Sequence, residues 1–347
     1  MTSPRAPLPG TLRLPAHRSV VRLGPGSRLL GLDPASALAV DDLPHALAEM
    51  LDELARPVPT AQLVERAVAR GAVAAEAEGL LGELVAAGVV IDAAGEERRE
   101  RRRVESTVLV VGGGPLSVGV LLGLAAAGVG AVHVTTSGTV LAADLGTGYV
   151  DADRGRTRAG ATAAALERLF PGVTTGTLPQ RVVPDLVVLA DAAASDPVQV
   201  AALHADGTAH LPVRLRDGSG IVGPLVLPGR TTCLGCLELE RCARDPGWPT
   251  VSAQLVGTPG RADPACVTAT VGLATAQALV ALDAVACAGA EPVPSVDVTL
   301  ELDVDRGALT RRDWSPHPSC GCGAARGGTR HGVATCAEGR ARDTIEG

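Results

Sequence analysis

The stretch Thr107-Val-Leu-Val-Val-Gly-Gly-Gly-Pro-Leu-Ser117 decides the fold of this chain. Val108 to Val111 are apolar and mostly β-branched, which is typical of a buried parallel strand. The glycines that follow allow a tight turn because they carry no Cβ. Residues 118–127 are then apolar enough for a helix packed on a sheet, and residues 131–134 predict the next strand. This order predicts the opening βαβ unit of a nucleotide-binding sheet, with the turn facing a phosphate.

The segments after this unit continue the α/β pattern. Apolar runs predict further strands, and helical spacing of small and apolar residues predicts helices between them. The predicted strands are residues 185–190, 211–215, 220–227, 295–304 and 307–311, and the predicted helices are residues 158–169, 198–204 and 268–288.

The bulk composition excludes several functions. The 347 residues include no lysine, so neither a Schiff-base lysine nor a Walker-type phosphate lysine exists here. A net charge of −7 offers no general attraction to nucleic acid. No basic-then-apolar signal pattern opens the chain, and no uninterrupted apolar run of about 18 residues suggests a membrane span. We therefore expect a cytoplasmic protein with no nucleic-acid partner and no membrane partner.

Composition shifts divide the chain into several parts. Residues 1–10 are expected to be a flexible tail, and residues 11–92 predict a small winged-helix-like α+β domain. The charge run at 93–106 predicts a linker, residues 107–322 form the large domain, and the Gly- and Arg-rich residues 323–347 predict a disordered tail. Within the small domain the predicted helices are residues 43–55, a second helix with Thr60 as its N-cap, and residues 74–87, followed by a strand at 89–91.

The small domain has more than one functional interpretation. Its second and third predicted helices carry a mixed set of charges, and DNA binding needs clustered positive charge instead. A second interpretation is peptide binding, in which an extended peptide adds to an exposed sheet edge and lies against a helix. A purely structural appendage is equally compatible with these residues. The sequence leaves the last two open.

The glycine turn has the form Gly112-x-Gly114-x-x-Ser117. Between a strand and a helix this pattern indicates a phosphate-binding turn, although a tight turn without a ligand has the same pattern. Dinucleotide sites also place an acid at the end of the second strand, where this chain has Thr135 and Thr136. NAD and FAD therefore lack their ribose contact.

Cys233-Leu-Gly-Cys236 and Cys320-Gly-Cys322 are spaced as two pairs of metal ligands. A C-x-x-C pair brings two thiolates onto one turn, and a second pair completes a tetrahedron around Zn²⁺. Because four thiolates leave no open position for water, we expect a structural zinc. The alternative is a redox C-x-x-C motif, which needs no second pair.

The remaining cysteines have no partner spacing. Cys266 precedes a predicted helix, whose dipole would lower the pKa of its thiol, so it is the one thiol worth testing as a nucleophile. We expect Cys287 in the core and Cys336 in the tail, and Cys242 is unassigned.

With these motifs in view, the chain resembles the ThiF/MoeB/HesA family, which shares the fold of ubiquitin-activating enzymes. The resemblance rests on the glycine turn, on residues 220–236 (GIVGPLVLPGRTTCLGC) and on the closing cysteine pair. It implies a Rossmann-type mixed sheet with helices on both faces, ATP and Mg²⁺ as cofactors, adenylation of a C-terminal carboxylate, and a zinc site. Residues 228–249 and 314–322 are most similar to an actinobacterial subgroup linked to bacteriocin and thiazole/oxazole-peptide cyclodehydratases. That subgroup carries an N-terminal element resembling a leader-peptide recognition module.

The chain departs from the family at its nucleotide site. The segment that holds the family's ATP-binding arginine falls at residues 144–148, where this chain has no arginine. The family's lysine falls at Arg158, and its Mg²⁺-holding aspartate falls near Asp191. Arg158 and Asp191 are therefore the catalytic candidates, beside Gly112, Gly114 and Ser117 as the cofactor-binding turn.

Adenylation requires positive charge at the phosphates and acids that hold Mg²⁺. With most of these groups substituted, the sequence favours a protein that binds a precursor leader peptide and presents it to a partner cyclodehydratase. The alternative is an active adenylyltransferase acting on a peptide or sulfur-carrier carboxylate. A homodimer is a candidate assembly for either.

Overall fold

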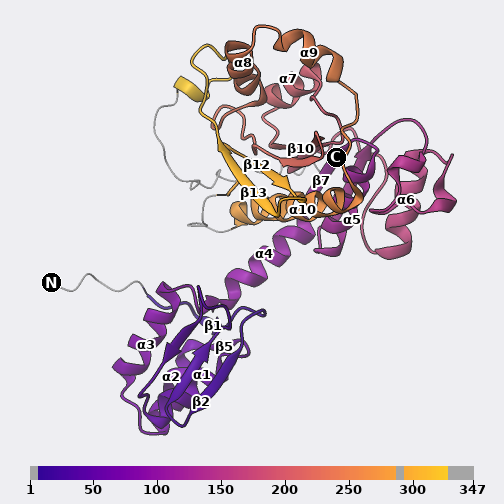
Figure 1. The fold of residues 1–347 in the computed structure, drawn as a ribbon. Helices are drawn as coiled ribbons and strands as arrows, with labels where there is room; N and C mark the ends of the chain where they lie inside the picture. Colours follow the sequence, from indigo (N-terminus) through magenta and orange to yellow (C-terminus); the bar gives the residue numbers. More distant parts are fainter. Residues whose placement is uncertain (1–6, 287–292, 327–347) are drawn as a thin grey trace, which may run out of the picture. The chain divides into compact units, whose positions relative to one another are not determined.

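Figure 1 shows the computed structural model of the chain, whose described part comprises residues 7–286 and 293–326. The chain divides into two compact units, Met1–Arg99 and Glu100–Gly347. Most of both predicted tails, together with Cys287 and Cys336, lies outside the described residues.

The N-terminal unit is the expected small α+β domain. One antiparallel sheet has the strand order β2-β3-β4, and a smaller one has the order β5-β1-β6. Leu12, Leu30, Met50, Leu63 and Leu81 are completely buried and belong to one core between these sheets and the helices. The elements are β1 (Thr11–Arg13), β2 (Val20–Gly24), β3 (Ser27–Leu30), β4 (Leu38–Val40), α1 (His45–Glu53), β5 (Val58–Pro59), α2 (Thr60–Ala69), α3 (Ala74–Ala86) and β6 (Ile91–Asp92).

The predicted helices of this unit are confirmed to within two residues at most ends, but the predicted cap is wrong. Pro59 is the N-cap residue of α2, and no side chain caps the helix. The Thr60 hydroxyl instead donates a hydrogen bond of 2.5 Å to the carbonyl of Pro9. Thr60 therefore fixes the segment that precedes β1.

The charged run folds as a helix, α4 (Ala93–Glu105). Arginine and glutamate are good helix formers, so a solvated charge run is compatible with helix formation. Its last turn belongs to the C-terminal unit, where Arg103 donates to Asp283 on the last long helix.

The C-terminal unit is built on a mixed sheet of strand order β13-β12-β11-β10-β9-β7-β8. Strands β8, β7, β9 and β10 are parallel, and β11, β12 and β13 add antiparallel at one side. This confirms the predicted α/β fold with a mixed sheet. Its strands are β7 (Thr107–Val111), β8 (Ala131–Thr135), β9 (Leu186–Ala190), β10 (His210–Arg216), β11 (Ser219–Val222), β12 (Val298–Asp303) and β13 (Ala308–Asp313).

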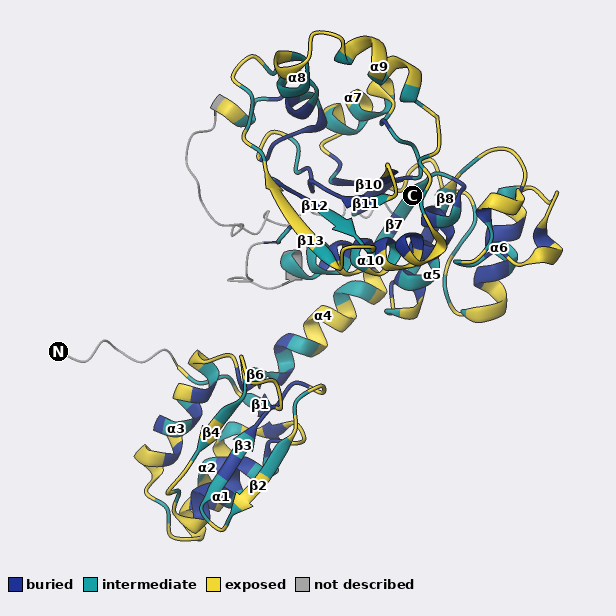
Figure 2. Ribbon diagram, in the orientation of Figure 1, coloured by how far each residue is buried: buried dark blue, intermediate teal, exposed yellow. Residues whose placement is uncertain are grey.

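Helices cover both faces of this sheet, and Figure 1 shows α5 and α10 on one side and α7, α8 and α9 on the other. Both inner faces are buried (Figure 2), because parallel strands need cover on each side. The helices are α5 (Pro115–Ala126), α6 (Arg158–Leu169), α7 (Pro197–Ala205), α8 (Leu234–Arg244), α9 (Trp248–Leu255) and α10 (Pro264–Ala286), with short 3₁₀ turns at Ala142–Asp144, Asp151–Asp153 and Ala324–Arg326.

Two glycines on α5 explain how closely it meets α10. A Cβ on Gly119 would lie 2.7 Å from Val271, and a Cβ on Gly123 would lie 2.7 Å from Thr275. Glycine costs about 1 kcal/mol relative to alanine inside a helix. Here it permits contact between the two helices that form the core on this face.

Helix α10 is, among the described helices, the one long and apolar enough to cross a membrane by length and composition. Its side chains Val267, Ala274, Ala278 and Leu282 instead lie in the core against the sheet. It is therefore a core helix of this unit.

Two parts of the C-terminal unit differ from the prediction. The strand predicted at 220–227 ends at Val222, because Gly223 has φ +92° and Pro224 has no N–H to continue the ladder. Helices α8 and α9 were not predicted. Leu234 and Leu237 give α8 its buried face.

Candidate functional site

The glycine turn joins β7 to α5 as the sequence predicts. Gly112 has φ +144°, a conformation that side chains rarely adopt, and its N–H donates to the carbonyl of Thr135. Gly114 is the N-cap residue of α5, and Pro115 is its first residue. Proline suits this position because the first N–H of a helix has no partner within the helix. The remaining N–H groups of the first turn face outward as donors.

Asp191 supplies the acceptor for those donors. It follows β9 directly, with φ +70°, and its carboxylate accepts from the N–H groups of Gly114 at 2.8 Å and Leu116 at 3.0 Å. Ser117 donates to the same carboxylate through its N–H at 3.3 Å and through its hydroxyl. The predicted residues Gly114, Ser117 and Asp191 therefore do lie together, and they bond to one another.

Two opposing effects act on the pKa of Asp191 in this contact. Burial raises the pKa of the Asp191 carboxyl above its ordinary value, and the hydrogen bonds from Ser117, Gly114 and Leu116 offset only part of that rise. An anion at a helix N-terminus is favoured by the helix dipole. The carboxylate thus occupies the kind of position in which related turns bind a phosphate.

The glycines of the turn are needed for contacts within the protein. A Cβ on Gly114 would lie 2.7 Å from the Asp191 carboxylate, and one on Gly112 would lie 2.7 Å from the carbonyl of Ala190. A Cβ on Gly113 would lie 2.6 Å from Cδ of Arg158. Protein atoms therefore fill the space beside each of these glycines.

Arg158, the weak catalytic candidate, lies beside the turn but is already paired. Its guanidinium donates to the buried carboxylate of Asp144 at 2.8 and 3.2 Å, and to the carbonyl of Ser137 at 3.4 Å. Asp144 also accepts the N–H of Leu141. The sequence alone gave no reason to select Asp144, whose role is to hold Arg158.

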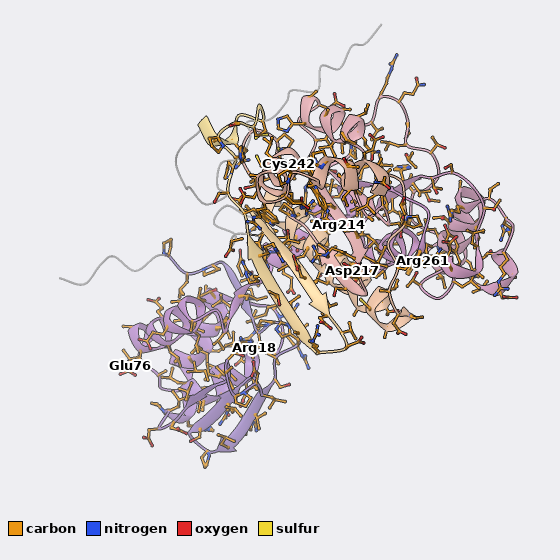
Figure 3. All side chains as sticks on the ribbon, turned by 45° about the horizontal axis from the view of Figure 1, so that its top comes forward. Arg18, Glu76, Arg214, Asp217, Cys242 and Arg261 are labelled. Carbon is orange, nitrogen blue, oxygen red and sulfur yellow. The ribbon has the colours of Figure 1, made fainter. Side chains whose placement is uncertain are left out.

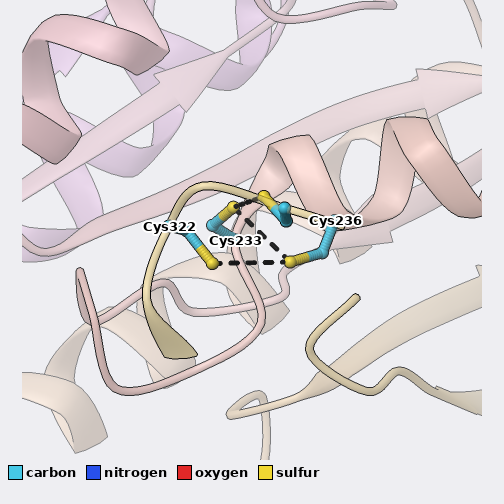
Figure 4. A group of neighbouring side chains, drawn as sticks. Cys233, Cys236 and Cys322 are labelled. Carbon is cyan, nitrogen blue, oxygen red and sulfur yellow. Dashed lines mark hydrogen bonds between the residues drawn. The ribbon is translucent and has the colours of Figure 1, made fainter. Parts of the chain in front are cut away.

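The four predicted metal-ligating cysteines are brought together (Figure 4). Cys233 is the N-cap residue of α8, and Cys236 lies in its first turn. The Sγ atoms lie 3.7 Å apart for Cys233 and Cys236, 3.6 Å for Cys233 and Cys320, and 3.6 Å for Cys236 and Cys322. All four sulfurs lie within 4.8 Å of one another.

This spacing fits a tetrahedral metal. A Zn²⁺ ion bonded to four sulfurs at about 2.3 Å places neighbouring Sγ atoms about 3.8 Å apart. The redox interpretation needs no second pair, so the presence of Cys320 and Cys322 at 3.6 Å from the first pair favours the metal. Burial raises the pKa of the Cys233 thiol, and a bound cation would favour its thiolate form.

Cys266 does not have the exposure that a nucleophile needs. Its side chain is 2% exposed and belongs to the core around α10, and its sulfur faces the hydroxyl of Thr270 at 3.9 Å. A core position is the better description of this thiol.

Comparison with solved structures identifies the fold. The chain is similar to E. coli MccB with ATP, at a TM-score of 0.69 and 13% identity over 90% of this chain and 99% of that chain. The microcin C7 biosynthetic enzyme MccB in complex with N-formylated MccA gives a TM-score of 0.67 with the same identity and coverage. The structure of PaaA covers 86% of this chain and 99% of its own length, at a TM-score of 0.58 and 13% identity.

No protein-family model matches the chain, and no curated protein matches it by sequence. The similarity to MccB therefore shows a ThiF-like fold, as the sequence resemblance implied, and shows the fold alone.

Proposed function

We propose that this protein binds the leader of a ribosomally made precursor peptide and presents it to a partner cyclodehydratase, without using ATP itself. The proposal that the protein does not use ATP rests on the contact of Asp191 with the first turn of α5. Precursor peptides are made in the cytoplasm, which is the expected location of the protein. A homodimer is compatible with this role.

Binding a nucleotide at the turn would require Asp191 to leave. A phosphate competes for the same N–H groups, and its charge repels the carboxylate. The carboxylate would lose bonds from Gly114, Leu116 and Ser117. Arg158, the cation beside the turn, is held by Asp144, and the chain contains no lysine. These contacts support a turn closed by the protein's own side chain, with ATP and Mg²⁺ excluded.

The N-terminal unit offers a place for a peptide. A groove of about 980 Å³ lies between α2 and α3, with Val64 and Val85 among its apolar lining residues and Glu65 and Glu78 among its charged ones. Residues 7–9 already line it. The Thr60 hydroxyl and N–H both bond backbone carbonyls of this segment, at Pro9 and Gly10. The groove therefore already holds a segment of chain, and its acids favour a peptide with basic and apolar residues.

The zinc that we propose for the four cysteines has a structural role. Cys233 and Cys236 at the start of α8 would be tied to Cys320 and Cys322 near the end of the described chain. All four ligands come from the protein, so the ion would offer no open coordination position.

An active adenylyltransferase is the second candidate. It is favoured by the shared fold with MccB, whose solved structures include complexes with ATP and with AMPCPP and SeMet MccA. In this case Asp191 would turn away from α5 and hold Mg²⁺. Exchange of pyrophosphate into ATP separates the two candidates, because only an adenylating enzyme catalyses it.

The peptide-binding half is tested by titrating labelled leader peptides, taken from precursors encoded beside this gene, against the full-length protein. We expect one cognate leader to bind and Val64→Arg to weaken its binding at least about tenfold, because a charge would enter the apolar part of the groove. Val68→Arg, at an exposed position of the same helix outside the groove, is the matched control. Failure of every cognate leader to bind would remove this role.

A further inference from the structure

Arg214 occupies an unusual position in the sheet. It lies on β10, whose residues Leu211, Val213 and Leu215 face the core beneath α5 and α10. Because side chains alternate along a strand, Arg214 faces the opposite layer, towards α7, α8 and α9. Arg214 is labelled in Figure 3. The residue is only 7% exposed.

The nearby carboxylates are taken by other groups. Glu238 accepts from Arg241 at 2.6 Å and from the indole of Trp248 at 2.5 Å. Glu301 is paired with Arg216 at 2.9 Å and with an arginine of β13. Within residues 7–286 and 293–326, no hydrogen bond or ion pair joins the guanidinium of Arg214 to another side chain or to the backbone. The guanidinium therefore has no partner among the described groups, and it borders the two cavities described next.

Two cavities meet at this side chain. One has a volume of about 650 Å³, and the other about 610 Å³, and Arg214 and Arg241 line both. The first is lined by residues of α7, α8 and α9 and of the cysteine cluster, and its apolar lining includes Val200, Leu234, Leu237 and Val256. Its size lies within the range of small-molecule sites, which are mostly apolar with a few placed polar groups.

An arginine in this environment is destabilised. Burial and the neighbouring cations Arg241 and Arg216 lower the pKa of Arg214 to about 10, and the carboxylates of Glu238 and Glu301 oppose this only in part. An unpaired buried charge costs several kcal/mol, and proteins retain such groups mainly at binding or catalytic positions. The missing counter-charge would come from outside the described chain.

We propose that Arg214 binds the carboxylate of a ligand whose apolar body fills the larger cavity. A guanidinium is planar and matches a carboxylate through two parallel hydrogen bonds. The neighbouring cation Arg241 is already paired with Glu238. A phosphate dianion would therefore find fewer free donors than it needs, whereas a single carboxylate is satisfied by Arg214 alone. This site lies on the sheet face away from α5, and it does not rest on the proposed leader binding.

The chain provides its own reporter for this site. Its two tryptophans are Trp248, which lines the smaller cavity, and Trp314. Both rings face the guanidinium of Arg241, at 5.1 and 5.8 Å. A ligand reaching Arg214 would change their fluorescence.

The experiment titrates the full-length protein with octanoate while tryptophan fluorescence and the thermal midpoint are followed. A short apolar peptide with a free C-terminal carboxylate is the second arm, and the tighter of the two identifies the source of the carboxylate. We expect saturable binding that raises the thermal midpoint. Octanol and the C-terminally amidated peptide should not bind, because they lack the charge.

Substitutions of Arg214 test whether its guanidinium binds the carboxylate. Arg214→Met should weaken binding at least about tenfold while the ligand-free thermal midpoint stays equal or rises, because an uncompensated charge is removed. Arg214→Lys should keep part of the affinity. Arg306→Met is the control, since Arg306 pairs with Asp303, lines neither cavity and does not contact a tryptophan ring. The proposal is overturned if neither the fatty acid nor the peptide binds, or if binding survives Arg214→Met. It is also overturned if inorganic phosphate at equal concentration displaces the ligand, or if Arg214→Met lowers the ligand-free thermal midpoint.

Discussion

Asp191 accepts hydrogen bonds from both the hydroxyl and the N–H of Ser117, so the end of β9 closes the first turn of α5. The two residues lie 74 positions apart in the sequence. This contact joins the switch region of the sheet to the turn that in related folds receives a phosphate.

Ser117→Ala should destabilise the C-terminal unit by about 1.5–3 kcal/mol, because one hydrogen bond to a buried carboxylate is lost. Denaturant unfolding followed by tryptophan fluorescence measures this, since both tryptophans lie in that unit. Thr250→Ala, at an exposed position of α9, should change stability by less than about 0.5 kcal/mol. Equal effects of the two substitutions would show that the Asp191 contact adds nothing.

The purified protein should contain about one zinc per chain, and Cys233→Ser should release it, because three thiolates do not complete the tetrahedron. Metal content by mass spectrometry gives the result. Cys242→Ser is the matched control, because Cys242 lies on the same helix outside the cluster and should retain the metal. Well-folded, metal-free wild-type protein would refute the site.

Asp52→Asn should lower the free energy of unfolding of the N-terminal unit by about 3 kcal/mol. Arg28 is 3% exposed and donates to Asp52 at 2.7 and 2.9 Å, so the substitution leaves a buried guanidinium without its anion. Hydrogen exchange of the α1 and β3 amides reports on this unit, which contains no tryptophan. Unchanged protection of these amides would contradict the prediction.

The same pair gives a pH dependence. Burial raises the pKa of Asp52, but the hydrogen bonds from Arg28 and Arg22 outweigh it and hold the pKa below its ordinary 3.8. The stabilisation is therefore fully present above that value and is lost as the pH falls through the folded-state pKa. Asp52→Asn should lose this part of the acid sensitivity of α1 protection. A variant as acid-sensitive as the wild type would locate the titrating group elsewhere.

Several parts of this fold could be read from the sequence because they depend on local patterns. The strand at Val108, the helix that begins at Arg158 and the strand pair near the end were predicted with small boundary errors, since burial period and glycine positions are local signals. The cysteine cluster was predicted because ligand spacing is itself a sequence feature.

Other parts depend on contacts distant in the sequence. Thr60 was predicted to cap α2, but its hydroxyl donates a hydrogen bond to the carbonyl of Pro9, 51 residues away. No sequence motif singles out Asp144 or Arg214, and their importance follows from their surroundings. Asp144 binds Arg158, and the guanidinium of Arg214 has no partner among the described groups. Only the folded chain shows whether a charge is paired.

Calorimetric titration of ATP with Mg²⁺ into the full-length protein, together with pyrophosphate exchange, tests the closed turn most directly. We predict no heat of binding up to millimolar nucleotide and no exchange, because the Asp191 carboxylate holds the donors of α5. Micromolar binding of ATP with exchange that is lost in Asp191→Asn would contradict the account and identify an adenylating enzyme.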